Sequence, residues 1–306
     1  MDTTESNVAR AAQWIARADA LIIAAGAGMS VDSGLPDFRG SSGIWTTLLP
    51  AGMHERDLGA FTQGHCFADN PREAWRFFGR ALDVCRDTPP HAGYALLRDW
   101  AAGKRHGAFV YTSNVDGQFQ AAGFDEMRIL ECHGSIHHFQ CARPCSPATW
   151  PAPCAIVPAR PPCCIHCGGP ARPNFLLFSD PAWVVTRTNA QRLRMEVWRG
   201  TAANAVVIEI GAGLALPAVR MFAESLRLPL VRINAHDAEA EGESVLSLQG
   251  TALDLLQRID RSLATWSGQD KQLDPASATL LNETIEKTFH EHPGSPPQHP
   301  PVRREP

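Results

Sequence analysis

Short, uniformly apolar runs constrain the fold of this chain more than any other feature. "ALIIAAG" (20–26) is too short and too uniform for a surface element, so it predicts a strand buried on both faces. Further runs have the same character: "AFVYTSN" (108–114), "MRILECHG" (127–134), "NAVVIEIGAG" (204–213) and "LPLVRIN" (228–234). Strands of this kind belong to parallel sheets that helices cover on both sides.

Segments with helical periodicity lie between these runs. Apolar residues recur at helical spacing from Val8 onward, and residues 54–87 hold two predicted helices. One of these begins with Asn70 as its cap and Pro71 in its first turn. "ALDLLQRIDRSLATW" predicts an amphipathic helix further toward the C-terminus. Buried strands that alternate with helices predict an α/β fold with a doubly wound, Rossmann-like parallel sheet.

Composition excludes several classes of function. Of the 306 residues, 44% are hydrophobic and 20% are charged, which is enough for a sizeable core. A net charge of −4 and a pI of about 6.3 give no basic surface for nucleic acid. No apolar run approaches the roughly 20 residues that span a bilayer, and the start "MDTTESNVARAAQW" is too polar and acidic for a signal peptide. We therefore expect a cytoplasmic protein that binds neither nucleic acid nor membranes.

The first predicted strand leads into a glycine-rich loop, "GAGMSVDSGLPDFRG" (26–40). A Gly-x-Gly turn at the carboxyl end of a parallel strand lets the backbone approach a pyrophosphate, and a helix that starts there offers N–H donors. A tight turn between a strand and a helix would explain the glycines equally well. It would not explain Asp37, Phe38 and Arg39 in succession between a proline and a glycine.

This loop matches the pattern Gly-Ala-Gly-x-Ser-x-x-Ser-Gly-[Ile/Leu]-Pro-Asp-Phe-Arg-Gly at every fixed position. Through this match the chain resembles the sirtuins, a family of NAD-dependent protein lysine deacylases, and it looks like a divergent, bacterial-type member. Further family blocks follow in order: "TSNVDGQFQAAG" (112–123), "ECHGS" (131–135), "CCIHCGGPARPNFLLFSD" (163–180), "GAGLALPA", "INA" and "LQGTALDLL". The resemblance covers roughly residues 15–260. It implies a Rossmann-like domain with a small zinc-binding module and a small helical module inserted.

The resemblance implies that NAD is a co-substrate and that the substrates are proteins with an acylated, most simply acetylated, lysine. The acyl oxygen attacks the nicotinamide ribose, nicotinamide leaves, and the products are free lysine and O-acyl-ADP-ribose. His133 in "ECHGS" would be the general base that activates a ribose hydroxyl, and the usual histidine pKa of about 6.5 suits that role. Asn114 and Asp116 would be the other catalytic residues, near the nicotinamide. An Asx turn at the strand end is the alternative for this pair.

The NAD-binding residues that the resemblance implies come from the glycine-rich loop and from the later family blocks. They are Gly26, Ala27, Gly28, Ser30, Asp37, Phe38, Arg39, Ser113, Asn114, Asp116, Gly211, Ala212, Gly213, Asn234, Thr251 and Ala252.

Departures from the family pattern bear on the activity. Ser113 replaces a glutamine, and Ala212 and Gly213 replace the Thr-Ser of a Gly-Thr-Ser-Leu block. The loop that holds the ribose therefore lacks two hydroxyls. In the segment that pairs with the substrate, Ser179 and Asp180 replace the Gly-Glu of a Phe-Gly-Glu block. An ADP-ribosyltransferase or NAD glycohydrolase on the same scaffold stays an alternative, and a binding module without activity is a third hypothesis.

The nine cysteines of a chain expected in the cytoplasm suit metal ligands or free thiols better than disulfides, which stay the alternative. The best ligand set for one structural, tetrahedral zinc per chain is Cys141, Cys145, Cys164 and Cys167. The second pair has the usual Cys-x-x-Cys spacing, whereas the first pair is one residue longer. Cys154, Cys163 and His166 are spare candidates, and Cys163 competes with Cys164 for the third ligand position.

The predicted domain organisation follows from these segments. It comprises a Rossmann-like domain (1–53, 88–135 and 174–268), a helical module (54–87), a zinc-binding module (136–173) and a proline-rich tail predicted to be disordered (290–306). The expected partners are proteins with acylated lysines. The sequence leaves the oligomeric state open.

Overall fold

The structure is a computed structural model that describes residues 3–35, 62–156, 160–240 and 242–270. Residues 1–263 form one compact unit, and the last turns of the final helix are the described part of a second unit, 264–306. The elements in chain order are α1 (Thr3–Arg17), β1 (Ala20–Ala25), α2 (Gly28–Val31), α5 (Cys66–Asp69), α6 (Pro71–Asp87), α7 (Ala92–Ala102), β2 (Ala108–Thr112), α8 (Gln118–Ala121), a 3-10 turn (Glu126–Arg128), β3 (Ile129–Glu131), β4 (Gly134–Cys141), β5 (Trp150–Pro151), β6 (Ala171–Phe175), α9 (Thr186–Arg199), β7 (Ala205–Ile210), α10 (Ala218–Ser225), β8 (Leu230–Asn234), β9 (Val245–Gln249) and α11 (Ala252–Asp270).

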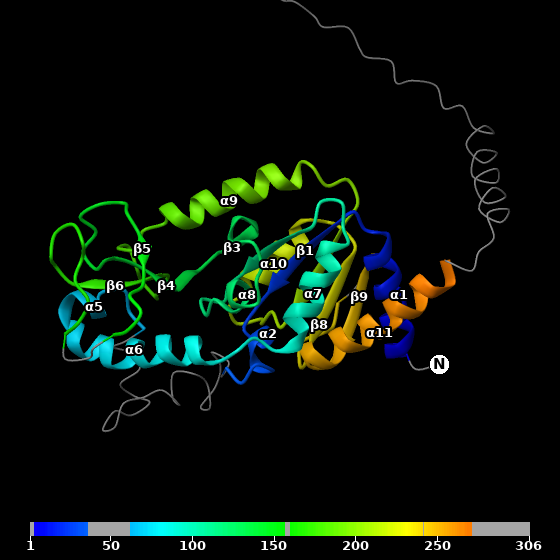
Figure 1. Ribbon diagram of the computed structural model, residues 1–306, viewed down its shortest axis with the longest axis horizontal. Helices are drawn as coiled ribbons and strands as arrows, with labels where there is room; N and C mark the ends of the chain where they lie inside the picture. The colour runs from blue at the N-terminus through cyan, green and yellow to red at the C-terminus, as the bar shows by residue number, and fades with distance from the viewer. Residues whose placement is uncertain (1–2, 36–61, 157–159, 241, 271–306) are drawn as a thin grey trace, which may run out of the picture. The chain divides into compact units, whose positions relative to one another are not determined.

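A parallel sheet with the strand order β3-β2-β1-β7-β8-β9 forms the larger part of the fold (Figure 1). Every neighbouring pair in it is parallel, with Leu21 of β1 opposite Ala108 of β2 and Val206 of β7. The predicted α/β class with a doubly wound sheet is therefore confirmed. After β1, the chain adds β2 and β3 on one side of that strand; it then adds β7, β8 and β9 on the other side. The crevice between the carboxyl ends of β1 and β7 is the switch point at which such sheets bind ligands.

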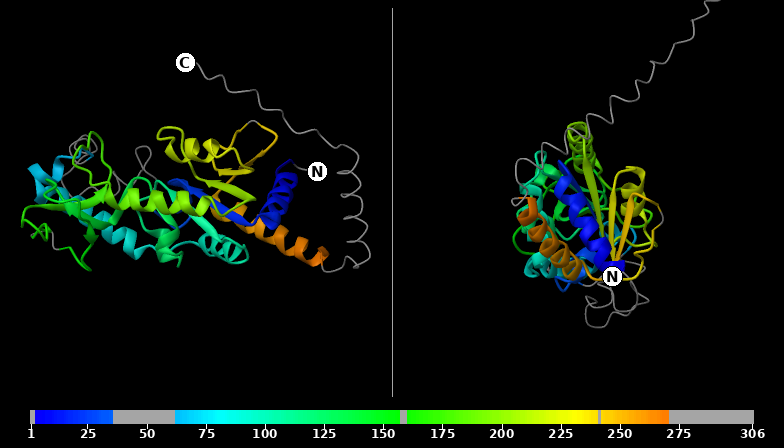
Figure 2. Two further views of the ribbon diagram at one scale, coloured as in Figure 1. Left: turned by 90° about the horizontal axis from the view of Figure 1, so that it is seen from above. Right: turned by 90° about the vertical axis from the view of Figure 1, so that its right-hand side faces the viewer.

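Side chains of the strands alternate between two layers of helices. On β1, Leu21 and Ile23 pack in a cluster with α1, α7 and α11, whereas Ala20 and Ile22 pack in a cluster with α9 and α10. Figure 2 shows α1 and α11 side by side on one side of the sheet. Because both sheet faces are buried, each strand reads as a continuous apolar run, as the sequence predicted.

Three glycines allow the loops after β1 and β7 to touch. A Cβ on Gly26 would lie 2.6 Å from the Gly211 carbonyl oxygen, and a Cβ on Gly28 would lie 2.7 Å from the Gly211 Cα. Gly211 itself has a φ of 61°, a conformation that L side chains rarely adopt. The glycine-rich loop is thus required by a backbone-to-backbone contact at the switch point.

The helical and zinc-binding modules share one hydrophobic core. An antiparallel sheet, β5-β4-β6, packs with α5 and α6 around a cluster that includes Phe67, Trp75, Phe78, Phe139 and Phe175. The helix α6 begins as predicted, with Pro71 in its first turn and the Asn70 side chain accepting from the Glu73 amide. The division of the chain into domains stays a prediction.

One predicted strand is shorter in the structure. The strand expected at 127–134 is confined to Ile129–Glu131, and Cys132 and His133 form a turn before β4. Gly134 makes the bend possible with a φ of 81°, because a Cβ there would lie 2.2 Å from the Asn174 carbonyl oxygen. The sheet also gains β9, which the sequence reading missed although Leu246 and Leu248 alternate with polar residues.

Part of the predicted site lies outside the described residues. Asp37, Phe38 and Arg39 fall within 36–61, and the predicted tail falls within 271–306.

The loop contact predicts a specific loss of stability for Gly211→Ala. Gly107 is the matched control, because it has a similar φ of 66° but no atom within 4 Å of a built Cβ. Gly107→Ala should lower the free energy of unfolding by the cost of the left-handed conformation, about 1–2 kcal/mol. Gly211→Ala should lose about 1–3 kcal/mol more, because its Cβ would lie 2.4 Å from the Gly28 Cα. Equal losses in denaturant titrations would contradict the contact.

Candidate active site

A pocket lies at the carboxyl ends of β1, β7, β8 and β9. Of the residues expected to bind NAD, it is lined by Ala27, Gly28, Gly211, Asn234, Thr251 and Ala252. The sequence reading missed the other lining residues, which are Val31, Asp32, Ile233, Ala235, His236 and Gly250. These are near neighbours of motif residues and carry no pattern of their own. Only the order of the strands brings them together.

Asp32 gives one corner of this pocket its chemical character. Its Oδ2 accepts a hydrogen bond of 2.7 Å from the backbone N–H of Leu253 in the first turn of α11. The Thr251 hydroxyl accepts one of 3.4 Å from the backbone N–H of Asp254. A carboxylate at a helix N-terminus occupies the position that an anion would otherwise take. This corner therefore suits a ligand that donates hydrogen bonds, such as a ribose, better than a phosphate.

Asn234 and Arg220 join the loops after β7 and β8. The Asn234 Nδ2 donates to the Ala212 carbonyl at 2.7 Å, and its Oδ1 accepts from the amides of His236 and Asp237, each at 3.1 Å. Arg220 donates to the carbonyls of Ala212 and Asp237 at 3.3 and 2.5 Å. The Ala212 methyl packs in the cluster beneath α10. The side chains of Asn234 and Arg220 thus hold this loop through its backbone carbonyl. In the family pattern the same loop has two hydroxyl side chains.

Ser30, Asn114 and Asp116 form a buried hydrogen-bonded cluster. The Ser30 hydroxyl donates to Asp116 Oδ2 at 2.6 Å, and the Asn114 Nδ2 donates to Ser30 Oγ at 3.1 Å and to the Gly26 carbonyl at 3.0 Å. Asp116 also accepts from the Gln118 amide at 2.9 Å, so the Asx turn is present together with the long-range contact. Burial raises the pKa of Asp116, and the bonds from Ser30 and Gln118 oppose that shift.

His133 lies in the turn between β3 and β4. Its carbonyl accepts from the Leu176 amide at 2.9 Å, and its half-buried ring bonds to the backbone of Ser113. Burial lowers the pKa of His133 below the usual histidine value, so its imidazole is neutral at pH 7. Residue 113 contacts His133 through its backbone. The replacement of the family's glutamine by serine at this position leaves that contact unchanged. Cys132, beside it, is buried in the cluster with α9, and burial raises the pKa of its thiol to about 11.

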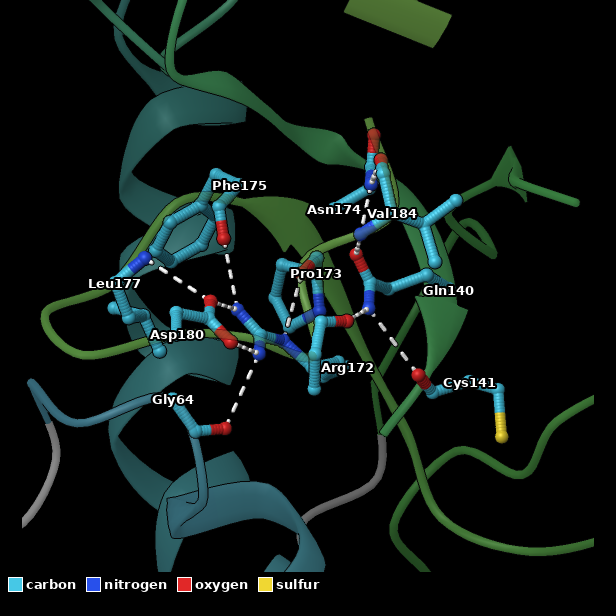
Figure 3. A network of polar contacts seen from close by, with 11 residues as sticks. Gly64, Gln140, Cys141, Arg172, Pro173, Asn174, Phe175, Leu177, Asp180 and Val184 are labelled. Carbon is cyan, nitrogen blue, oxygen red and sulfur yellow. Dashed lines mark hydrogen bonds and ion pairs between the residues drawn. The ribbon is translucent and has the colours of Figure 1, made fainter. Parts of the chain in front are cut away.

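A buried ion pair shapes the segment that follows β6 (Figure 3). Arg172 has no exposed side-chain surface and donates to both carboxylate oxygens of Asp180, at 2.8 and 2.6 Å, and to the Gly64 carbonyl at 3.1 Å. Asp180 also accepts from the Leu177 amide at 3.2 Å. Ser179 adopts a φ of 47°, the left-handed conformation that favours glycine. Ser179 therefore adopts a conformation that suits the glycine of the family pattern, and Asp180 is held by Arg172.

Four cysteine sulfurs converge where β4 meets the loop before β6. The Sγ atoms of Cys141, Cys145, Cys164 and Cys167 lie within 4.8 Å of one another. The distance is 3.8 Å from Cys141 to Cys167 and 3.6 Å from Cys145 to Cys164. Tetrahedral zinc with Zn–S bonds of about 2.3 Å separates its sulfurs by about 3.8 Å, so the four thiols fit a structural zinc. The four cysteines of the predicted ligand set thus lie together, and the sulfur of Cys164 rather than that of Cys163 belongs to this cluster.

The comparisons with known proteins agree with this geometry. The chain matches the family model described as "Sir2 family" over residues 26–214, which is more than half of its length, and it belongs to that family. A relative named "NAD-dependent protein deacylase 2" from Pyrobaculum aerophilum is 30% identical over 246 residues, covering 78% of this chain and 88% of the relative. The "NAD-dependent protein deacylase" of Mycolicibacterium paratuberculosis is 30% identical over 252 residues, covering 78% and 97%.

Solved structures share the fold. The crystal structure of a Sir2 homolog–NAD complex aligns with a TM-score of 0.62 at 20% identity, covering 84% of this chain and 93% of that one. Among the helices that the structure describes, none has the length and apolar character needed to cross a membrane.

The cysteine cluster predicts a metal-dependent fold. Cys167→Ser should reduce bound zinc from about one per chain to near zero and unfold the module around β4–β6, because a structural zinc site contributes directly to folding. Cys163→Ser is the matched control: this exposed thiol is next to Cys164, and its sulfur is outside the cluster. Elemental analysis and limited proteolysis measure both effects. Full zinc occupancy in Cys167→Ser would contradict the assignment.

Proposed function

We propose that this protein is an NAD-dependent protein lysine deacylase, most simply a deacetylase, which releases nicotinamide, free lysine and O-acyl-ADP-ribose. The observation that carries the proposal is the position of four residues in the segments that directly follow β1, β2 and β3, at the same sheet edge as the pocket: Ser30, Asn114, Asp116 and His133. The relatives named as NAD-dependent deacylases support the same reaction.

We assign the binding of NAD, the co-substrate, to both halves of this edge. The pocket beside Gly28, Gly211 and Asn234 takes the adenosine half, with Asp32 as an acceptor for hydroxyl groups. The cluster around Asn114 and Asp116 takes the nicotinamide half. Both amide hydrogens of Asn114 are used within the protein, and no hydrogen bond in the described part of the chain involves its Oδ1. That oxygen is therefore the acceptor that the ligand would meet.

His133 acts as the general base in this proposal. Bound NAD supplies a ribose carbon that loses nicotinamide when the acyl oxygen of the substrate attacks it. The neutral imidazole of His133 then accepts the proton of a neighbouring ribose hydroxyl, whose oxygen bonds to the former acyl carbon. The bond from that carbon to the lysine nitrogen breaks, and the lysine leaves with the proton. A water molecule then adds to the same carbon, so that the former acyl oxygen stays on the ribose carbon as its hydroxyl and the acyl group remains on the neighbouring ribose oxygen. Burial lowers the pKa of His133, which favours the unprotonated imidazole near neutral pH.

The expected substrates are proteins with acylated lysines, and the expected location is the cytoplasm. The protein names of the relatives support the first expectation. No disulfide forms among the described residues, which is compatible with the second. The zinc is structural in this proposal and takes no part in the reaction.

Nicotinamide release by the wild-type protein should depend on an acylated lysine, since the acyl oxygen is the nucleophile. His133→Ala should lower the formation of free lysine at least about 10²-fold, the usual effect of removing a positioned base. Mass spectrometry of the products measures both. An ADP-ribosyltransferase or glycohydrolase would release nicotinamide equally well without acylated peptide. A binding module would release none.

The pH profile should carry the signature of a base with a lowered pKa. Because the neutral form of His133 is the active one, activity should fall toward acid pH as one proton is taken up. The midpoint of that fall should lie below the usual histidine pKa of about 6.5, because burial lowers the pKa of His133. Turnover at saturating NAD and peptide measures the profile. A midpoint clearly above pH 6.5 would contradict the environment described for His133.

A further inference from the structure

We propose that Tyr94, a buried residue of α7, is a positioning residue of this site: its hydroxyl orients Ser30 and, through Ser30, the side chains of Asn114 and Asp116. The inference rests on the proposed function, because these three residues belong to the proposed NAD site. Tyr94 itself lies outside every sequence block that pointed to that function.

The Tyr94 hydroxyl reaches the cluster from beneath. Its oxygen lies 3.0 Å from Ser30 Oγ, and its side chain is fully buried. The ring contacts those of His91 and Phe119, with a centroid distance of 4.9 Å in each case. His91 accepts from the Gly93 amide and bonds to the Met29 carbonyl, which ties the start of α7 to the loop after β1. The hydroxyl is therefore fixed in its position relative to Ser30.

The direction of each hydrogen bond follows from counting donors. Ser30 has one hydroxyl hydrogen and gives it to Asp116 Oδ2 at 2.6 Å. It can then only accept from its other neighbours, so the Tyr94 O–H and the Asn114 N–H both donate to it. With two acceptor sites filled and its hydrogen used, Ser30 has no remaining hydrogen-bonding capacity.

The orientation of Asn114 depends on this arrangement. One hydrogen of its Nδ2 is bound by the Gly26 carbonyl and the other by Ser30, so the amide plane is fixed and Oδ1 is held in one direction. If Ser30 rotated toward another acceptor, both Asn114 and Asp116 would lose a partner. The Tyr94 hydroxyl opposes that rotation because it occupies the remaining side of Ser30 Oγ.

A merely structural role would not require the hydroxyl. Phenylalanine would fill the same apolar space and bring no polar atom that needs a partner. Tyr111 of β2, the chain's other tyrosine, provides the comparison. It stacks on Phe222 with centroids 3.8 Å apart and bonds to Cys132, in the cluster on the opposite face of the sheet.

The test compares Tyr94→Phe with Tyr111→Phe, which removes the same atom elsewhere. Calorimetry measures the affinity of each for NAD and for ADP-ribose, which lacks nicotinamide. Loss of one neutral hydrogen bond should weaken NAD binding and lower kcat by roughly three- to tenfold in Tyr94→Phe. Affinity for ADP-ribose should stay within about twofold, and Tyr111→Phe should change neither ligand. In Ser30→Ala, adding Tyr94→Phe should have no further effect on NAD binding, because the two act as a unit.

Three results would overturn the inference: an unchanged ratio of NAD to ADP-ribose affinity in Tyr94→Phe, an equal change in Tyr111→Phe, or additive effects with Ser30→Ala. Failure of the proposed function has a different signature. In that case the wild-type protein consumes no NAD when acetylated peptides are added. The ratio of NAD to ADP-ribose affinity in Tyr94→Phe would still test the role of Tyr94.

Discussion

The contact between the loops after β1 and β7 is the constraint on which the rest of the site depends. Gly26 and Gly28 meet Gly211 so closely that no side chain fits at any of the three positions. The contact lies at the carboxyl ends of the two central strands, where the chain changes the direction in which it adds strands to the sheet. The pocket opens on one side of it, lined by both loops, and the Ser30–Asn114–Asp116 cluster is tied to it through the Gly26 carbonyl.

In the part of the site that the structure describes, the side chains of Ser30, Asn114 and Asp116 are held by buried hydrogen bonds. The Asp116 carboxylate accepts hydrogen bonds from the neutral Ser30 hydroxyl and Gln118 amide, and burial lowers the pKa of His133. Charged groups have supporting positions: Arg172 and Asp180 hold the segment after β6, and Arg220 holds the loops that flank the pocket. A neutral, water-poor environment suits a base that must take a proton from a hydroxyl, since burial favours the uncharged imidazole.

Much of the fold could be predicted from the sequence, because strands that are buried on both faces consist of continuous apolar runs. The spacing of the cysteines predicted which of them lie together, and in the structure the sulfur of Cys164, not that of Cys163, belongs to the cluster. β9 was missed because only two of its side chains are fully buried. Tyr94, Asp32 and Arg220 could not be found, because their partners are brought to them by tertiary structure; Tyr94 and Ser30 are 64 positions apart. The way the loop is held at Ala212 could not be predicted either, because the side chains of Asn234 and Arg220 that bind its carbonyl come from other elements.

The central claim is that acyl removal and NAD consumption are one coupled reaction at this sheet edge. Following an isotope-labelled acetyl group from the lysine of a peptide tests it most directly. The account predicts that the label appears on ADP-ribose, with one nicotinamide and one free lysine formed for each labelled product. Label released directly as acetate, or nicotinamide formed in excess of free lysine, would contradict it.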